Sequence, residues 1–207
     1  SHIYGSRAAN GAIVITTKET DPFENILSNI AARTDLRETA FFLPTLYTDK
    51  DGLATLEFNS PEALTKWKVL LFAHNKDMNF GNAKYFTRTQ KQLMVRPNLP
   101  RFFREGDEIV IKAQIQNLDR ESVQGNAKIE LINPINNEVI NHLFFKGSAI
   151  IPFDVAGEQN GLVQWKINVP KDIESVIVKI IAGNEKHTDG EQIDIPILSD
   201  RILITDS

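Results

Sequence analysis

Apolar and polar residues alternate along much of the chain, which is the pattern of half-buried β-strands. Between Glu108 and Leu118, apolar residues at every second position alternate with mostly polar neighbours, and the segment from Val163 to Val169 repeats this pattern. Alternating or continuously apolar runs predict further strands at 54–58, 67–73, 127–132, 139–145, 149–155, 176–182 and 193–198. Turn formers such as Asp51-Gly52 and Asn133-Pro134 separate the runs. Many short strands with turns between them predict an all-β fold of two antiparallel β-sandwiches rather than a parallel α/β sheet.

The segment 22–33 departs from the strand pattern. Asp21-Pro22 followed by Glu24, with apolar residues spaced along one face, fits an N-capped helix that has proline at its first position. A strand from Ile26 to Arg33 fits the same stretch of sequence. The sequence therefore leaves both helix and strand open for this segment.

The length of the chain fits two domains. Its 207 residues divide into two units of about a hundred residues, each able to bury a core. We expect the boundary at Arg96–Pro100, because Pro97 and Pro100 cannot donate backbone hydrogen bonds and stiffen a short connector.

Composition excludes several classes of function. The chain is 42% hydrophobic and 24% charged with a net charge of -4, so it lacks the strongly basic balance of nucleic-acid-binding proteins and we expect no nucleic-acid partner. It contains no cysteine, which excludes disulfides, thiolate catalysis and cysteine-ligated metals. No apolar run approaches the roughly 20 residues of a membrane-spanning helix, and the N-terminus does not have the basic-then-apolar pattern of a signal peptide. The abrupt start at Ser1 suggests an excised piece whose targeting signals lie elsewhere.

Motifs in the first half of the chain resemble a known family. They comprise Arg37–Pro44 (RETAFFLP), the turn Asp49–Gly52, the stretch Ser60–Val69 and the segment Ala73–Asp77. Together they resemble the core signature of the alpha-2-macroglobulin family.

Two later stretches extend this resemblance over most of the chain. Leu93–Pro97 followed by Pro100–Asp107 is similar to the start of the next macroglobulin-like domain. Asp189–Gln192 followed by Pro196–Thr205 resembles the exit from that domain in bacterial members of the Bacteroidetes type. The resemblance implies that residues 21–95 are the second half of a macroglobulin-like domain, and that residues 96–207 are a complete macroglobulin-like β-sandwich.

The N-terminus resembles a different family. Ile3–Lys18 looks like the closing segment of the plug domain of TonB-dependent outer-membrane receptors, so residues 1–20 are expected to be the last strand of a plug-like domain. In the macroglobulin family a bait region is inserted at the corresponding place. A half-sandwich over residues 24–92 would leave an open edge and an uncovered apolar face. We expect the strand Ala12–Thr17, or a neighbouring molecule, to cover it.

Two motifs suggest chemistry. Ala156-Gly157-Glu158-Gln159 resembles the family's thioester sequence Cys-Gly-Glu-Gln, but a thioester requires the cysteine that Ala156 replaces, so we expect a hairpin loop between the strands at 149–155 and 162–169. Asp49, Asp51 and Gly52 resemble the start of a calcium loop. Ser60 stands where the bidentate glutamate should fall, which favours a hairpin turn.

Other residue types indicate structural roles. The histidines His2, His74, His142 and His187 show no metal-binding spacing, and no nucleophile elbow or phosphate loop is present. Trp67 and Trp165 are expected to anchor cores, and the cluster Arg101–Arg104 to pack between domains rather than form an exposed recognition loop. The sequence therefore nominates no catalytic residue, no cofactor-binding residue, no metal ligand and no cofactor.

The family resemblance implies a noncatalytic structural piece of a large cell-envelope protein, periplasmic or associated with the outer membrane. The whole protein would be a broad endopeptidase inhibitor that traps proteases through bait cleavage and domain rearrangement. Expected partners are other domains of the parent chain, proteases as targets of the whole protein, and a second copy of the chain through strand edges. The alternatives are an accessory or binding module of a TonB-dependent outer-membrane receptor and, less favoured, an enzyme fragment.

Overall fold

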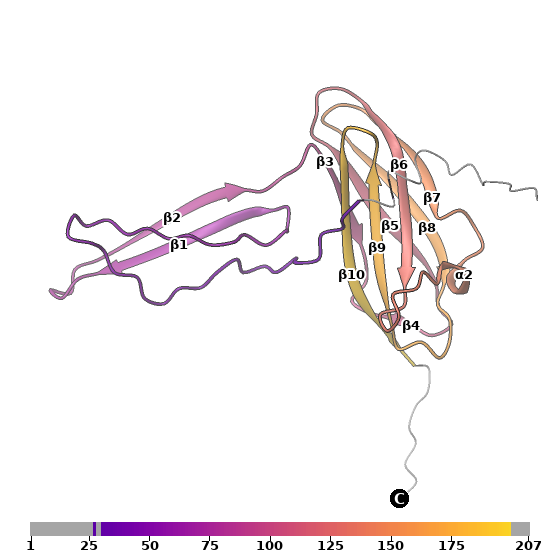
Figure 1. Cartoon of the computed structure of the whole chain (residues 1–207), viewed down its shortest axis with the longest axis horizontal. Helices are drawn as coiled ribbons and strands as arrows, with labels where there is room; N and C mark the ends of the chain where they lie inside the picture. Colours follow the sequence, from indigo (N-terminus) through magenta and orange to yellow (C-terminus); the bar gives the residue numbers. More distant parts are fainter. Residues whose placement is uncertain (1–26, 28–29, 200–207) are drawn as a thin grey trace, which may run out of the picture.

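A computed structural model describes Leu27 and residues 30–199, which form a β-sandwich and a long arm beside it (Figure 1). We name residues 30–33 the edge segment, residues 34–92 the arm and residues 93–199 the sandwich. The regular secondary structure of the described residues is strand except for one short helix, and these residues contain no helix that is long and apolar enough to cross a membrane. The expectation of an all-β, antiparallel fold is confirmed.

The sandwich consists of two sheets. The five-stranded sheet has the order β4 (Phe103–Arg104), β10 (Thr188–Leu198), β9 (Ser175–Gly183), β6 (Val123–Ile132), β7 (Ile150–Val155). The three-stranded sheet has the order β3 (Leu93–Asn98), β5 (Glu108–Asn117), β8 (Asn160–Asn168). Neighbouring strands are antiparallel except for β4, which pairs in parallel with the last residues of β10.

The core lies between the two sheets and follows the alternation seen in the sequence. In β5 the inward residues Ile111, Ala113 and Ile115 are at most 1% exposed. Trp165 of β8 is buried, and its indole Nε1 donates a hydrogen bond to the carbonyl oxygen of Ala149 at 3.0 Å. Trp165 is therefore the core anchor that the sequence predicted, with its one polar group satisfied.

The arm contains one hairpin, formed by β1 (Lys66–His74) and β2 (Phe80–Arg88), and it extends away from the sandwich (Figure 1). The turn that joins β1 to β2 lies at the end of the arm far from the sandwich. Residues 34–65 run beside the hairpin without forming a strand, so the strand predicted at 54–58 is wrong. The ring of Phe58 instead packs on Phe41, with 4.3 Å between the ring centroids.

The segment predicted as a strand at 139–145 is also different in the structure. Asn141–Phe144 form the short helix α2, and Phe144 is buried against the core. The side chain of Asn141 accepts a hydrogen bond from the Leu131 amide at 2.7 Å and donates to the Ile129 carbonyl at 3.0 Å. This side chain thus satisfies backbone groups of β6 that a further strand would otherwise have paired.

The predicted connector at Arg96–Pro100 begins too early. Arg96, Pro97 and Asn98 belong to β3, which pairs with β5 in the register Pro97↔Ala113. β3 is the edge of its sheet, where a proline is tolerated because no ladder hydrogen bond is required on its open side. The sandwich therefore starts at Leu93, within the region expected to belong to the preceding half-domain.

The remaining N-terminal predictions lie largely outside the described residues. These include the plug-like strand at 1–20, the covering strand Ala12–Thr17 and most of the segment 22–33. Leu27 is helical and, with Ile30, packs on Ile181 at the outer face of the five-stranded sheet.

Candidate functional site

The thioester-like residues Ala156–Gln159 form a structural turn. They connect β7 to β8, which belong to different sheets, so the segment crosses the edge of the sandwich and is not the hairpin loop predicted from the sequence. The side-chain amide of Asn117 closes this crossing by donating hydrogen bonds to the carbonyls of Val155 and Ala156 at 3.2 and 3.1 Å. A Cβ added at Gly157 would collide with the Arg120 carbonyl, so close backbone packing accounts for this glycine.

The calcium-like residues also form a turn. One carboxylate oxygen of Asp49 accepts hydrogen bonds from the amides of Asp51 and Leu53 at 2.9 and 2.8 Å, and Gly52 has a φ of 77°. These features define an Asx-type turn that glycine completes. No group of three or more His, Asp or Glu side chains in the described part of the chain is arranged to hold a metal ion.

Aromatic and histidine residues singled out in the sequence lie apart from one another. Trp67 is half-buried near the start of β1. Its Nε1 donates a hydrogen bond to the hydroxyl of Thr89, which lies just after the end of β2, at 3.0 Å, and this bond connects the two strands. His74 lies near Phe72 on the hairpin, and His187 Nε2 is 3.8 Å from an oxygen of Asp119. His142 lies in α2, and His2 lies outside the described residues.

The cluster Arg101–Arg104 does not pack against the arm as predicted. Phe103 is buried in the core of the sandwich itself, while Phe102 is 44% exposed. The guanidinium of Arg104 lies over the Phe102 ring, with its carbon atom 5.6 Å from the centroid. β4 lies at the end of the sandwich away from the arm (Figure 1).

A buried charge cluster, which we name the joint, lies where the arm meets the sandwich. Its position is set by the edge segment, which runs along the free side of β10 and forms one isolated parallel bridge, Arg33 with Glu191. The Arg33 amide donates to the Gly190 carbonyl at 2.8 Å, and the Gln192 amide donates to the Arg33 carbonyl at 3.0 Å. A Cβ at Gly190 would lie 2.7 Å from the Ile181 side chain and 3.3 Å from the Ala32 backbone, so glycine allows this approach.

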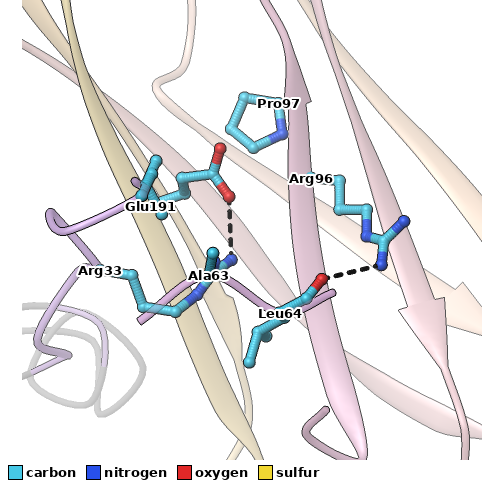
Figure 2. A pocket seen from close by; sticks show the side chains of 7 residues that line it. Arg33, Ala63, Leu64, Arg96, Pro97 and Glu191 are labelled. Carbon is cyan, nitrogen blue, oxygen red and sulfur yellow. Dashed lines mark hydrogen bonds and ion pairs between the residues drawn. The ribbon is translucent and has the colours of Figure 1, made fainter. Parts of the chain in front are cut away.

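The side chain of Arg33 enters the sandwich between β10 and β3. Its guanidinium donates to both carboxylate oxygens of Asp189 at 3.1 Å, to Glu191 at 3.0 Å and to the Val95 carbonyl at 3.1 Å. The Arg33–Glu191 contact is visible in Figure 2. Arg33 is 7% exposed and Asp189 is fully buried. A guanidinium that meets a carboxylate at two points, here through Nε and one terminal nitrogen, is a strong arrangement for a buried pair.

Asp189 accepts hydrogen bonds from two further groups, one at the end of the arm and one on β3. The ammonium of Lys91, at the end of the arm, lies 2.9 Å from Oδ1, and the Val95 amide donates to Oδ2 at 2.9 Å. This one carboxylate therefore links the edge segment, the C-terminal end of the arm, β3 and β10. Two cations and a backbone amide around Asp189 provide the compensation that a fully buried charge requires.

The joint extends outward into a small cavity of 280 Å³. Arg33, Ala63, Leu64, Arg96, Pro97 and Glu191 are among the residues that line it (Figure 2). The Arg96 guanidinium donates to the Leu64 carbonyl at 3.2 Å, which ties the base of the arm to β3. Burial raises the pKa of the Glu191 carboxyl, although the Arg33 charge opposes this shift.

The chemistry of the joint is structural. Its carboxylates are engaged by guanidinium, ammonium and amide donors, and the described residues place no nucleophile beside a general base there. The arrangement can fix the direction of the arm relative to the sandwich. The sequence analysis missed this site because Arg33 and Asp189 are 156 residues apart. One signal was present: Asp189 and Glu191 occupy the inward positions of β10 that Ile193 and Ile195 continue.

Comparisons with known proteins match parts of this chain to alpha-2-macroglobulins. Residues 39–129 match the sequence profile of the Alpha-2-macroglobulin family. A curated alpha-2-macroglobulin homolog of Nostoc is 32% identical over 95 residues, which is 46% of this chain and 5% of the relative. The alpha-2-macroglobulin of Thermotoga maritima is 25% identical over 170 residues, which is 82% of this chain and 10% of the relative.

A solved structure shows the same fold. Trypsin-activated alpha-2-macroglobulin from Escherichia coli superposes with a TM-score of 0.60 over 72% of this chain, at 13% sequence identity. The matched part is 10% of that chain. The chain thus spans a tenth or less of the length of the relatives it matches.

Proposed function

Starting from this support for the alpha-2-macroglobulin family, we propose that the chain is a noncatalytic structural module of a much larger macroglobulin-like protein of the protease-inhibitor type. The sandwich is one macroglobulin-like domain, and the arm is half of the domain before it. The joint holds the two in a fixed relation. The matched region is only 5% and 10% of the length of the two curated relatives, which supports the proposal that the parent protein is much larger.

The contrast between the arm and the joint is the observation that carries the proposal. Large apolar side chains of the arm point into solvent: Phe42 is 85% exposed and Tyr47 is 86% exposed. Soluble proteins rarely leave so many such side chains uncovered together. The base of the arm, in contrast, is fastened to the sandwich by a buried and fully paired carboxylate. The base of the arm is firmly attached, but its apolar side chains are uncovered. This combination is expected of a half-domain whose other half is supplied by further chain.

The finer parts of the proposal follow the family resemblance. The parent protein would trap proteases when a bait segment is cleaved and its domains rearrange, and the joint would pass such a movement from one domain to the next. We place the parent in the cell envelope of a Bacteroidetes-type bacterium. The plug-like string at residues 1–20 supports a plug-like insertion where the family has its bait region.

The receptor alternative receives no support from the comparisons, because the matched proteins are macroglobulins. The enzyme alternative has no candidate residues in the described part of the chain. Neither is carried further.

Hydrogen exchange tests the half-domain proposal. Amides of β1 and β2 are expected to exchange much faster than amides of β5 and β9 in the 207-residue chain, and to become protected in the longer parent protein. The sandwich strands serve as the internal control, since their protection should be the same in both. Equal exchange of the hairpin in both proteins would contradict the proposal.

Incubation with proteases tests the noncatalytic assignment. The chain alone should not slow the cleavage of a small peptide substrate, and it should form no covalent adduct that survives denaturing electrophoresis. An adduct would show that the Ala156–Gln159 turn, or another group, has a reactivity that the structure does not provide.

A further inference from the structure

One face of the β1–β2 hairpin combines cations with large apolar side chains. Cross-strand partners in an antiparallel pair point to the same side, and the side alternates along each strand. The register therefore gathers one set of residues on a common side, which we name the basic face: Lys66, Lys68, Leu70, Phe72 and His74 of β1 with Arg88, Phe86, Lys84, Asn82 and Phe80 of β2. All of these residues are exposed, and none of them is acidic.

The apolar groups on the basic face are well exposed and lie close to its cations. Phe72 is 69% exposed and Phe80 is 75% exposed, and their rings stack with 6.4 Å between centroids. Nearer the sandwich, the Lys66 ammonium lies 4.3 Å from the centroid of the Phe86 ring. The face therefore presents positive charge and apolar surface interleaved, rather than in separate zones.

The incompleteness of the arm does not by itself account for this exposure. The opposite side of the hairpin carries no charged residue; Trp67, Val69 and Ala83 there are half-buried, while Leu71 and Tyr85 are 46% and 62% exposed. A second sheet that completes the domain would pack on this more apolar side. The basic face would then remain on the outside of the completed domain.

We propose that the basic face binds the surface of a lipid bilayer that contains anionic phospholipids. The apolar side chains would enter the interface between headgroups and acyl chains, and the lysines would meet lipid phosphates while their methylene stems lie along the apolar surface. An antiparallel strand of nine residues is about 30 Å long, so the hairpin can lie flat on such a surface.

The composition of the basic face favours lipid over a protein partner. Three of its four cations are lysines, and lysine is depleted in protein interfaces, where arginine, tyrosine and tryptophan dominate. A lipid surface needs only point charges, which lysine supplies. A second copy of the same face is disfavoured as the partner because the two sets of cations would repel each other. The proposal goes beyond the protease-inhibitor-type function, and it rests on the proposed half-domain only for the statement that the basic face stays on the outside.

Co-sedimentation of the full 207-residue chain with vesicles tests the proposal. The chain should bind vesicles of phosphatidylcholine mixed with phosphatidylglycerol and bind vesicles of phosphatidylcholine alone weakly, and added salt should weaken the binding. The double variant Lys68→Gln with Lys84→Gln should bind anionic vesicles about 25-fold more weakly, at about fivefold for each cation near the surface. The matched control is Lys112→Gln with Lys146→Gln, which removes the same charge from exposed positions of the sandwich and should bind like the unaltered chain.

A second variant tests the apolar part. Phe72→Ser with Phe80→Ser should also weaken binding to anionic vesicles, and because both rings are exposed it should leave the thermal unfolding of the sandwich unchanged. Four results would overturn the proposal: no binding to anionic vesicles, equal binding to neutral vesicles, undiminished binding by the lysine variant, or an equal loss in the control. Sedimentation without vesicles would assign the face to self-association and would overturn the proposal as well.

Discussion

Arg33 and Asp189 form a buried, two-point ion pair across 156 residues of sequence, with both nitrogen–oxygen distances at 3.1 Å. Arg33 comes before the arm, and Asp189 belongs to β10, the last strand of the sandwich. The pair therefore connects the two parts of the molecule through its interior and not through its surface.

Removing one partner of this pair should destabilise the sandwich strongly. Arg33→Met or Asp189→Asn leaves an opposite charge buried without its partner, and we expect the free energy of unfolding to fall by about 3–5 kcal/mol. Urea unfolding followed by the fluorescence of the buried Trp165 measures this loss.

Two further variants make that measurement specific. The double variant should lose less than the sum of the two single losses, because the residues are in direct contact. Arg37→Ala breaks an exposed ion pair with Asp35 and should change the free energy of unfolding by less than about 1 kcal/mol. Equal losses in the free energy of unfolding from breaking the exposed pair and the buried pair would contradict the structural role assigned to the joint.

Gly190→Ala should loosen the edge segment. The added methyl group would press on Ile181 and on the Ala32 backbone, and overpacking of this kind costs about 1–3 kcal/mol. Faster hydrogen exchange of the Gln192 amide, which the Arg33 carbonyl accepts, would report the loosening directly. Gly147→Ala is the control, since an added Cβ there meets nothing within 4 Å.

Glu130 should make the sandwich sensitive to acid. Burial alone would raise the pKa of its carboxyl, but hydrogen bonds from Lys128 and Lys179, each at 2.9 Å, lower the pKa below the ordinary value of 4.5. A carboxyl with a lowered pKa stabilises the folded state above its unfolded pKa, and that contribution disappears as the pH falls through the folded pKa. Glu130→Gln should therefore be less stable than the unaltered chain at pH 7, with a difference that shrinks towards pH 3. A constant difference across this range would contradict the assignment.

Glu191 should have the opposite pH dependence. Burial raises the pKa of this carboxyl above 4.5, so its contribution to stability is full below the unfolded pKa and is lost as the pH rises through the folded pKa. Glu191→Gln should remove this decline, so that the stability of the variant relative to the unaltered chain increases as the pH rises through and above 4.5. Unfolding curves at matched ionic strength measure both carboxyl variants in one series.

The alternation of residues predicted most of the sandwich because its strands are buried on one side only. In β5 and β8, core packing and local pattern agree, so a period of two in the sequence was sufficient. β2 was not predicted, since Gly81, Asn82 and Lys84 interrupt any apolar period in that stretch. The segment 139–145 has apolar residues of strand type, but the Asn141 side chain pairs with β6 and the backbone turns into a helix instead.

The joint was beyond the reach of local patterns. Arg33 lies in a segment for which helix and strand fitted equally well, and Lys91 is an isolated cation with no distinctive spacing. Only tertiary structure brings them to the same carboxylate. A charged residue at an inward strand position, as at Asp189, is the kind of sequence signal that indicates such a site.

Arg33 and Lys91 stand at the two ends of the arm, and both bind Asp189. The outgoing and the returning chain of the arm are therefore both attached to the same carboxylate of β10, in addition to the Arg96–Leu64 hydrogen bond to β3. A movement of the turn between β1 and β2 would therefore act on Asp189 through either chain of the arm. Removing this one carboxylate would weaken both attachments together, whereas a break in the arm between residues 34 and 90 would leave both ion pairs in place.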